Sequence, residues 1–368
     1  MFFIYNTYED RSIHEIVKRQ VNHDAVFNSK FTSGNNFSYK LALIEKIKPQ
    51  IISLGSSRVM QFREELFKTS FVNAGGGMNH LNEGYLFLKE MIKFHKPEYI
   101  ILGLDFWWFN SNFNQPETFP NHSLNGDTDF KQKVITIFHL IKDGKVDLDT
   151  FFYGLFSFKN KITNFENIGI NAIDYSNGFR KDGSYFYSQF IFGETNNHDI
   201  NFSNTFKRID NGNSRFEYSE HVSQERVKIF NDIVNFSKIN DIKIVVFIPP
   251  LPKEVLNKMD SLGIKYNFVE EFRQIVKNSD IENYDYHDMK NFLDNSCEFI
   301  DGFHGGDVIY QRILKDMHNK NSILKKYINI EQINLSIKKN EGKVLSIFDE
   351  SKYKLKKEID FLEIGCTK

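Results

Sequence analysis

The chain has 368 residues, of which 40% are hydrophobic and 15% aromatic, so it carries ample apolar material for a folded core. Its formal net charge is -1, from 47 basic and 48 acidic residues that are well mixed, and no basic stripe indicates nucleic-acid binding. No apolar stretch approaches the roughly 20 residues needed to cross a bilayer. The two cysteines, Cys297 and Cys366, exclude a disulfide framework and form no zinc-type spacing, so we expect no metal and no cofactor.

The first ten residues, MFFIYNTYED, begin with an apolar segment, Met1 to Tyr5, that has two interpretations. It is an ordinary first strand or arm, which we favour, or it is the last turn of a membrane anchor that begins upstream. Residues 1–40 are therefore predicted to form an N-terminal arm.

Residues 41–110 alternate between strand and helix patterns. PQIISLG is a short apolar run that ends in glycine, and PEYIILGLDF reads as a second buried strand. Between them, HLNEGYLFLKEMIKFHK places Leu81, Tyr85, Leu88 and Ile92 at helical spacing. This alternation predicts an α/β fold in three layers, with a parallel sheet flanked by helices.

Residues 111–221 interrupt the alternation and are rich in Asn, Phe, Ser and Gly, so we predict a long insertion or lid. Helices are expected at residues 130–142 and 149–158. The segment GFRKDGSYFY predicts a hairpin that turns at Asp182 and Gly183, because Asp-Gly tolerates the positive φ values of such turns.

The α/β pattern resumes after residue 222. A helical face begins near Val227, and IKIVVFIPP predicts a strand. Helices are expected near residues 253–262 and 268–278, followed by a short strand in YDYHDM. DGFHGGDVIYQRILKDM then predicts a turn that leads into a helix. Residues 41–110 and 222–318 thus form the predicted core, and residues 319–368 a C-terminal tail.

The chemistry is predicted where IISLGSSRVMQF leaves the first strand. A serine there lies at the carboxyl edge of the sheet, where open α/β folds bind ligands. Its hydroxyl needs a base, and the base needs an orienting carboxylate. Asp301 and His304, three residues apart in IDGFHGG, provide such a pair, with Nδ1–H donating to Asp301 and Nε2 facing outward.

A glycine-rich segment, FVNAGGGMNH, is predicted to form a bend between the first strand and the next helix. Backbone N–H groups near Asn73 and Gly75 could stabilise the oxyanion of a tetrahedral intermediate there. An anion-binding bend before a helix is the other interpretation of the same glycines.

Four short blocks, LGSSR, NAGGG, ILGLDF and DGFH, resemble in this order the SGNH, or GDSL-type, hydrolase superfamily. The resemblance implies a flavodoxin-like α/β fold in which Ser57, rather than Ser56, is the nucleophile. It also implies that His304 is the base, Asp301 its orienting partner, and Gly75 part of the oxyanion hole.

Gly-Ser-Ser in place of Gly-Asp-Ser is most similar to the subset that includes D-alanyl-lipoteichoic acid biosynthesis esterases and alginate-type O-acetylation proteins. Such proteins act outside the cytoplasm on cell-surface polymers, usually beside a membrane-bound O-acyltransferase. The resemblance therefore implies an extracytoplasmic acyl esterase or O-acyl(acetyl)transferase that acts on a bacterial surface glycan or polymer, with that acyltransferase as a partner. The alternative is a catalytically weak glycan-binding or accessory subunit of the same kind of system.

One block departs from the superfamily pattern. Where the pattern has Gly-x-Asn-Asp, this chain has Gly103, Leu104, Asp105 and Phe106. An ionised Asp105 cannot donate a hydrogen bond to an oxyanion and would repel it. Three explanations are open: Asp105 is protonated in an apolar site, Asn73 substitutes as the donor, or hydrolysis is weak.

Other residues have competing interpretations. Arg58 binds an acidic group of the substrate or forms a surface ion pair. Trp107 stacks on a sugar or, as we favour, packs in the core. His287, with Asp285 and Asp288, resembles half a metal site, although a solvated strand end is the favoured interpretation. Asp-x-Asp at residues 127–129 and 147–149 raises a glycosyltransferase alternative, which lacks a convincing preceding strand.

Overall fold

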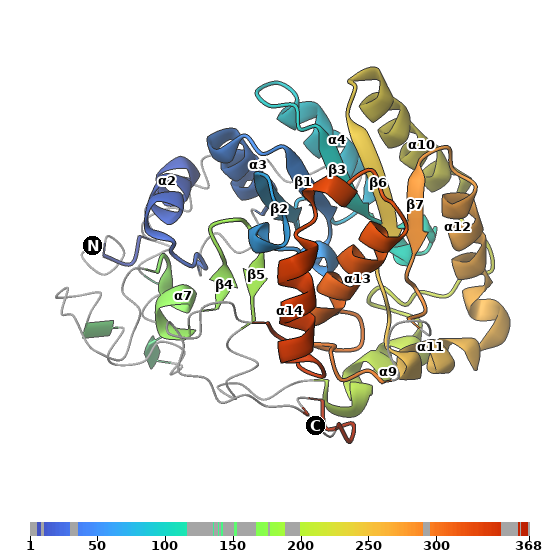
Figure 1. Ribbon diagram of the computed structural model, residues 1–368. Helices are drawn as coiled ribbons and strands as arrows, with labels where there is room; N and C mark the ends of the chain where they lie inside the picture. Colours follow the sequence, from blue (N-terminus) through green and yellow to red (C-terminus); the bar gives the residue numbers. More distant parts are fainter. Residues whose placement is uncertain are drawn as a thin grey trace.

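The computed structural model describes residues 6–8, 11–29, 36–115, 135, 139, 141–142, 151–152, 167–175, 177–187, 199–289, 295–346, 360 and 362–366. At its centre lies a five-stranded parallel sheet in the order β2-β1-β3-β6-β7 (Figure 1). The strands are β1 (Ile51–Gly55), β2 (Phe71–Gly75), β3 (Tyr99–Gly103), β6 (Lys243–Ile248) and β7 (Glu282–Asp285). The predicted α/β class with a parallel sheet is therefore confirmed.

Helices cover both faces of this sheet (Figure 1). On one face α3 (Asn36–Ile47), α4 (Leu81–Met91) and α10 (Gln224–Ile239) pack side by side. On the other face lie α13 (Asp307–Asn319) and α14 (Ile330–Asn340), and α12 (Asn267–Lys277) packs along β7. Further helices among the described residues are α2 (Ile13–His23), α7 (Ile170–Tyr175), α9 (Ser203–Asn211) and α11 (Lys253–Asp260).

Most of the predicted core elements are present, and two differ. The segment FVNAG was expected to be a bend, but it forms the edge strand β2, with Gly75 paired to Gly55 of β1. The strand expected in YDYHDM begins earlier, at Glu282, and ends at Asp285. The helices expected at residues 130–142 and 149–158 lie almost entirely outside the described residues.

The strands β1, β2 and β3 all end in glycine, and the structure gives the reason. A short 3₁₀ turn, Ser57–Val59, follows β1 and lays Val59 across the strand ends. A Cβ on Gly55 would lie 2.7 Å from Val59, one on Gly75 3.0 Å and one on Gly103 2.3 Å. Only strands that end without side chains leave room for this valine, so the glycines set how closely the turn approaches the sheet.

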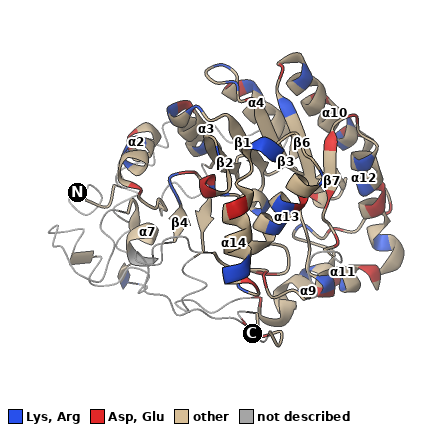
Figure 2. Ribbon diagram, in the orientation of Figure 1, with Lys and Arg blue, Asp and Glu red and all other residues tan. Residues whose placement is uncertain are grey.

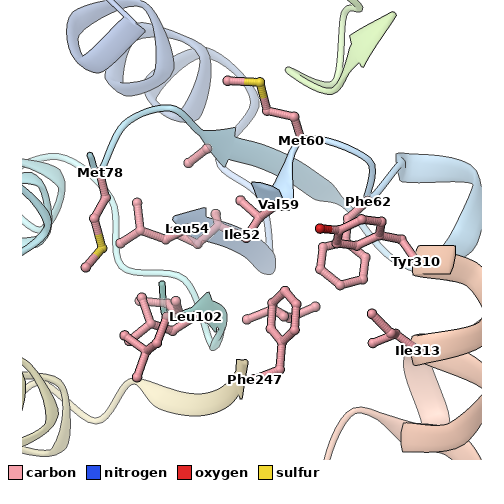
Figure 3. Packing of buried hydrophobic residues seen from close by; sticks show 14 of the residues in the cluster. Ile52, Leu54, Val59, Met60, Phe62, Met78, Leu102, Phe247, Tyr310 and Ile313 are labelled. Atoms are coloured by element: carbon pink, nitrogen blue, oxygen red, sulfur yellow. The ribbon is translucent and has the colours of Figure 1, made fainter. Parts of the chain in front are cut away.

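Aromatic packing holds the segment after Val59 against the α13 face (Figure 3). The ring of Phe62 meets that of Phe247 of β6 at 5.4 Å and that of Tyr310 of α13 at 4.9 Å, both edge to face. All three side chains are fully buried. Strands β1, β2 and β3 carry no charged residues, whereas Lys, Arg, Asp and Glu are spread over the helices (Figure 2).

The predicted hairpin is confirmed, and it covers the outer edge of β2, the edge strand of the sheet. Its strands are β4 (Gly178–Phe179) and β5 (Tyr185–Phe186), and Gly183 in the turn has a φ of 83°. The N–H of Asn73 donates to the carbonyl of Asp182 at 2.7 Å. The buried Nζ of Lys40 donates to the carbonyls of Asn73 and Gly183, which fastens the hairpin turn to β2 and blocks an edge that would otherwise be open to another strand.

Residues 320–346, predicted to belong to a tail, contain α14, whose Ile333 and Ile337 are buried where it packs on α13. A disulfide joins Cys297 to Cys366, and their spacing of 69 residues had given no reason to pair them. It links the segment 362–366 to the loop that precedes α13. The division into arm, core, insertion and tail otherwise stays a prediction.

Within the described ranges, every helix is too short or too polar to cross a membrane. The segment Met1 to Tyr5 lies outside those ranges.

Adding a methyl group at the end of β3 tests the glycine contact with Val59. Gly103→Ala forces its Cβ onto Val59, and we expect a loss of about 1–3 kcal/mol in the free energy of unfolding from overpacking. Val59→Ala alone creates a cavity and also destabilises. In the double variant the new methyl group occupies that cavity, so the loss, measured by urea unfolding, should be smaller than the sum of the single losses. Additive losses would contradict the contact.

Candidate active site

Three side chains predicted to act together lie in hydrogen-bond contact. Ser57 Oγ is 2.7 Å from His304 Nε2, and His304 Nδ1 is 2.7 Å from Asp301 Oδ2. Ser57 follows β1, whereas Asp301 and His304 lie in the loop before α13, so the contact joins segments 247 residues apart. The side chains of His304 and Asp301 are 14% and 23% exposed, which leaves the group within reach of a ligand.

The loop before α13 holds the carboxylate of Asp301 in one orientation. Its Oδ1 accepts the backbone N–H groups of Phe303 at 2.9 Å and His304 at 2.7 Å, while Oδ2 faces the imidazole. Burial raises the pKa of Asp301, but the charge and hydrogen bond of His304 and the two backbone donors outweigh it, so the pKa lies below its usual value. An ionised Asp301 accepts the Nδ1 proton, which leaves Nε2 free to accept the Ser57 hydroxyl proton.

Arg58, the residue after Ser57, is fixed inside the protein. Its Nη1 donates to Asp105 Oδ1 at 3.0 Å, and its Nη2 donates to the carbonyls of Pro249 at 2.9 Å and Pro250 at 2.6 Å. The side chains of Arg58 and Asp105 are each 1% exposed. Both expectations for Arg58 are therefore wrong: it reaches neither a substrate nor the surface, because its guanidinium ties the serine turn to the ends of β3 and β6.

Asp105 is the acidic partner of Arg58 in this buried ion pair. Burial raises its pKa and the charge of Arg58 opposes that rise. Because a guanidinium stays charged inside proteins, the contact is that of a buried carboxylate with its counter-ion. The aspartate that departs from the superfamily pattern is thus explained by its ion pair with Arg58. As a carboxylate, Asp105 supplies no hydrogen-bond donor to the site.

Asn73 and Gly75 do not have free donors for an oxyanion. The amide of Asn73 donates to the carbonyls of Val59 and Phe62, both at 2.8 Å, and its Oδ1 accepts the N–H of Gly75 at 2.8 Å. The N–H groups of Gly76 and Gly77 donate to Gly55 and Ala74. The expected oxyanion roles of Asn73 and Gly75, and the anion-binding bend, are corrected: these groups fix the backbone of the serine turn.

The backbone N–H of Ser57 differs from these groups. It donates no hydrogen bond within the part of the chain that the structure describes. It lies at the start of the 3₁₀ turn, where a first N–H has no partner inside the turn. Ser57 therefore combines the hydroxyl and one free donor for a developing oxyanion.

Trp107 is 2% exposed, as the core-packing interpretation expects. Its ring meets that of Phe303 at 6.5 Å, and the guanidinium carbon of Arg58 lies 5.3 Å from its centre. No face of the indole is open for a sugar to stack on.

The half metal site predicted around His287 is not formed. Asp285 and Asp288 both bind Arg273, at 2.6 and 3.4 Å, and the described residues contain no group of three or more His, Cys, Asp or Glu side chains arranged to hold a metal. The solvated strand end is wrong as well, since His287 is 3% exposed and packs edge to face on Phe106. A cavity of about 390 Å³ borders His287 but none of the three reactive residues, so we do not assign it to their chemistry.

Several residues near the triad carried no sequence signal. Tyr187, at the end of the hairpin, has its ring 6.4 Å from that of His304, and Phe303 has its ring 4.2 Å away. The guanidinium carbons of Arg208 and Arg215 lie 5.4 and 5.2 Å from the ring centre of Phe303. They belong to the predicted insertion, where no periodic pattern or motif marks them. The Asp-x-Asp segments at 127–129 and 147–149 lie outside the described residues.

No protein family, curated protein or solved structure matches this chain in the three comparisons.

Removing the negative charge opposite Arg58 tests the buried ion pair. Asp105→Asn keeps the shape but leaves a buried guanidinium without its counter-charge, so we expect a loss of about 3–5 kcal/mol in the free energy of unfolding. Urea denaturation measures this loss. Although asparagine is the residue of the superfamily pattern, we expect no gain of esterase activity, because Arg58 would be unpaired.

Two comparisons make that experiment specific. The double variant Arg58→Met, Asp105→Leu leaves no buried charge and should recover most of the stability. Glu90→Gln breaks an exposed pair with Lys93 and should change the stability little. An Asp105→Asn variant as mild as Glu90→Gln would contradict the role assigned to the pair.

His287 predicts a dependence of stability on pH. Burial, aided by the charges of Arg273 and Arg58, lowers its pKa well below 6.5. Below pH 6.5 the histidine of the unfolded chain binds a proton, whereas His287 of the folded protein does not. This residue therefore lowers the free energy of unfolding by up to about 1.4 kcal/mol for each pH unit of acidification. His287→Gln removes this contribution, and its free energy of unfolding should fall less steeply between pH 6.5 and 5.5. Parallel pH profiles from denaturant titrations would contradict a buried neutral histidine.

Proposed function

We propose that the chain is an SGNH-like serine acyl esterase or O-acyl(acetyl)transferase. The observation that carries this proposal is the continuous hydrogen-bonded series from Ser57 through His304 to Asp301 at the carboxyl edge of a parallel sheet. A serine hydroxyl, an imidazole and an ionised carboxylate in this order form the constellation that activates serine for attack on an acyl carbon.

The reaction follows from the positions of the atoms. Ser57 Oγ attacks the carbonyl carbon of an ester while its proton passes to His304 Nε2, and Asp301 stabilises the imidazolium that results. The tetrahedral intermediate collapses when that proton is delivered to the leaving alcohol, which leaves an acyl group on Ser57. Water then gives hydrolysis, whereas a sugar hydroxyl gives acyl transfer to the sugar.

The supply of oxyanion donors limits the expected rate. The N–H of Ser57 is free, but the donors of Asn73 and Gly75 are used within the chain. Each preorganised donor contributes about 10²–10³ to the rate in enzymes of this type. We therefore expect slow turnover of simple esters. The same shortage of donors favours the second candidate, a glycan-binding or accessory subunit with weak catalysis.

The proposed substrate and location rest on the resemblance, and one structural observation supports the location. We propose O-acyl, most specifically O-acetyl, groups on a bacterial surface glycan or polymer as the substrate. A membrane-bound O-acyltransferase would be the partner. The Cys297–Cys366 disulfide supports an oxidising compartment outside the cytoplasm, because disulfides persist in such compartments.

A fluorophosphonate probe, which reacts with activated serines, tests the proposal. We expect labelling at Ser57 in the wild type and none in Ser57→Ala. His304→Gln removes the base and should slow labelling by at least about 100-fold. The rate of probe incorporation, followed by intact-protein mass spectrometry, measures these effects.

Ser56→Ala is the matched control. Ser56 precedes the nucleophile, and its Oγ accepts the N–H of Arg58 at 3.1 Å without contacting His304. The variant should be labelled near the wild-type rate. A folded wild type that is not labelled and cleaves no aryl acetate would overturn the enzymatic proposal in favour of the binding role.

A further inference from the structure

Two arginines outside the triad share one aromatic ring beside it. The guanidinium carbons of Arg208 and Arg215 lie 5.4 and 5.2 Å from the ring centre of Phe303, and Arg215 is also 5.8 Å from the ring centre of Trp107. Phe303 directly precedes His304 in the chain. The two guanidiniums therefore lie close to the loop that carries the proposed base.

Neither arginine has a carboxylate within ion-pair distance among the described residues, and neither guanidinium forms a hydrogen bond with them. This contrasts with Arg58, whose Nη1 donates to Asp105 and whose Nη2 donates to two carbonyls. Arg208 and Arg215 are half-buried, so water solvates them only in part. Two partly desolvated cations that contact the same ring, neither in an ion pair with a carboxylate, favour a negatively charged ligand.

The electrostatic surroundings of Arg215 point the same way. Burial lowers its pKa, Arg208 and Arg58 lower it further, and Asp105 and Asp301 oppose them from beyond contact distance. The positive charge of Arg215 thus interacts with the negative charge of Asp301. A bound anion would stabilise the Arg215 guanidinium, from which water is partly excluded.

The backbone holds Arg215 in place at the expense of strain. The turn that closes with a hydrogen bond from Phe216 N–H to Asn213 O has positive φ at both central residues, 52° at Ser214 and 84° at Arg215. Phe216 is fully buried, and its carbonyl accepts the hydroxyl of Tyr266 at 2.8 Å, so the turn is anchored on its far side. Strained conformations in non-glycine residues are concentrated at ligand-binding sites.

Arg208 is fixed to the same loop through α9. The carboxylate of Asp199 accepts the hydroxyl of Thr205 in α9 and the N–H of Gly302, both at 2.7 Å. A Cβ on Gly302 would lie 2.3 Å from the Thr205 hydroxyl oxygen, so helix and loop are in close contact. The position of α9, which carries Arg208, relative to the loop of Asp301 and His304 is therefore set by direct contacts.

We propose that Arg208 and Arg215 form an anion subsite that binds a carboxylate or phosphate group carried by the substrate close to its reactive ester. Planar guanidiniums bind such groups through paired charge-assisted hydrogen bonds. The subsite would orient the ester toward Ser57 and select acidic polymers over neutral ones. The role of the subsite in orienting the ester rests on the proposed acyl chemistry. Binding of the anion does not, because it can be measured without turnover.

Isothermal titration calorimetry on Ser57→Ala tests the subsite with three small esters. They are 4-acetoxybenzoate, which carries a carboxylate, 4-acetoxyphenyl phosphate, and the uncharged methyl 4-acetoxybenzoate. We expect at least one anionic ester to bind about tenfold more tightly than the uncharged one, as charge-assisted hydrogen bonds would give. The two anionic esters separate a carboxylate subsite from a phosphate subsite.

Variants made in the Ser57→Ala background assign the effect to the arginines. Arg215→Gln should abolish the preference for the anion, Arg208→Gln should weaken it, and Arg215→Lys should retain part of it because the charge remains. Lys207→Gln is the matched control, since Lys207 is the neighbouring exposed cation on α9 and should not affect binding. Thermal unfolding of each variant confirms that it is folded.

Three results would overturn the subsite: equal affinity for charged and uncharged esters, an anion preference that survives Arg215→Gln, or no binding of either anionic ester at millimolar concentration. The proposed chemistry is judged separately by probe labelling at Ser57. If the protein prefers anions but is not labelled, the anion subsite stands and the enzymatic proposal is overturned. If it is labelled but shows no preference for anions, the enzymatic proposal stands and the subsite is overturned.

Discussion

The buried ion pair between Arg58 and Asp105 is the constraint on which the site depends. A charged guanidinium without its counter-ion inside a protein is costly, so the chain must bring the ends of β1, β3 and β6 together around this residue. Ser57 precedes Arg58 and takes its position from it. Val59 follows and fits against the glycines that end the first three strands. One turn of the chain is thus held from both sides, and a hydroxyl is presented at a fixed place on the sheet edge.

The same turn accounts for the unusual oxyanion donors. The amide of Asn73 is used to hold the carbonyls of Val59 and Phe62, and its oxygen holds the N–H of Gly75. Groups that could have stabilised a transition state instead stabilise the backbone that carries the proposed nucleophile, Ser57. With Asp105 paired to Arg58, the free N–H of Ser57 is a donor that remains in the blocks resembling the superfamily. For the proposed acyl chemistry, this shortage of donors implies slow turnover.

Selectivity is then expected from residues outside those blocks. The hairpin around Gly183 covers the edge of β2, and the segment that includes α9 and Arg215 packs against the loop of Asp301 and His304. The predicted insertion therefore contributes positive charge and aromatic surface at the triad. In the proposed function, the sheet edge, the serine turn and the loop of Asp301 and His304 would carry the chemistry, and the packed insertion would supply the contacts that distinguish one ester from another.

The sequence by itself determined the alternation of strands and helices and the hairpin at Asp182 and Gly183, and it offered Asp301 and His304 as a pair. These features are local, because hydrophobic periodicity, turn residues and a three-residue spacing lie within short stretches of the chain. The choice of Ser57 over Ser56 came from the resemblance to the SGNH superfamily. The strand β2 was missed because its glycine-rich end looks like a bend until it pairs with β1. Only the tertiary structure decided the partner of Arg58, which lies 47 residues away, and the proximity of Arg215 to Phe303. Pairing between polar groups that are distant in the chain leaves no periodic pattern in the sequence. Any carboxylate could pair with Arg58 until the fold brings one particular carboxylate within reach.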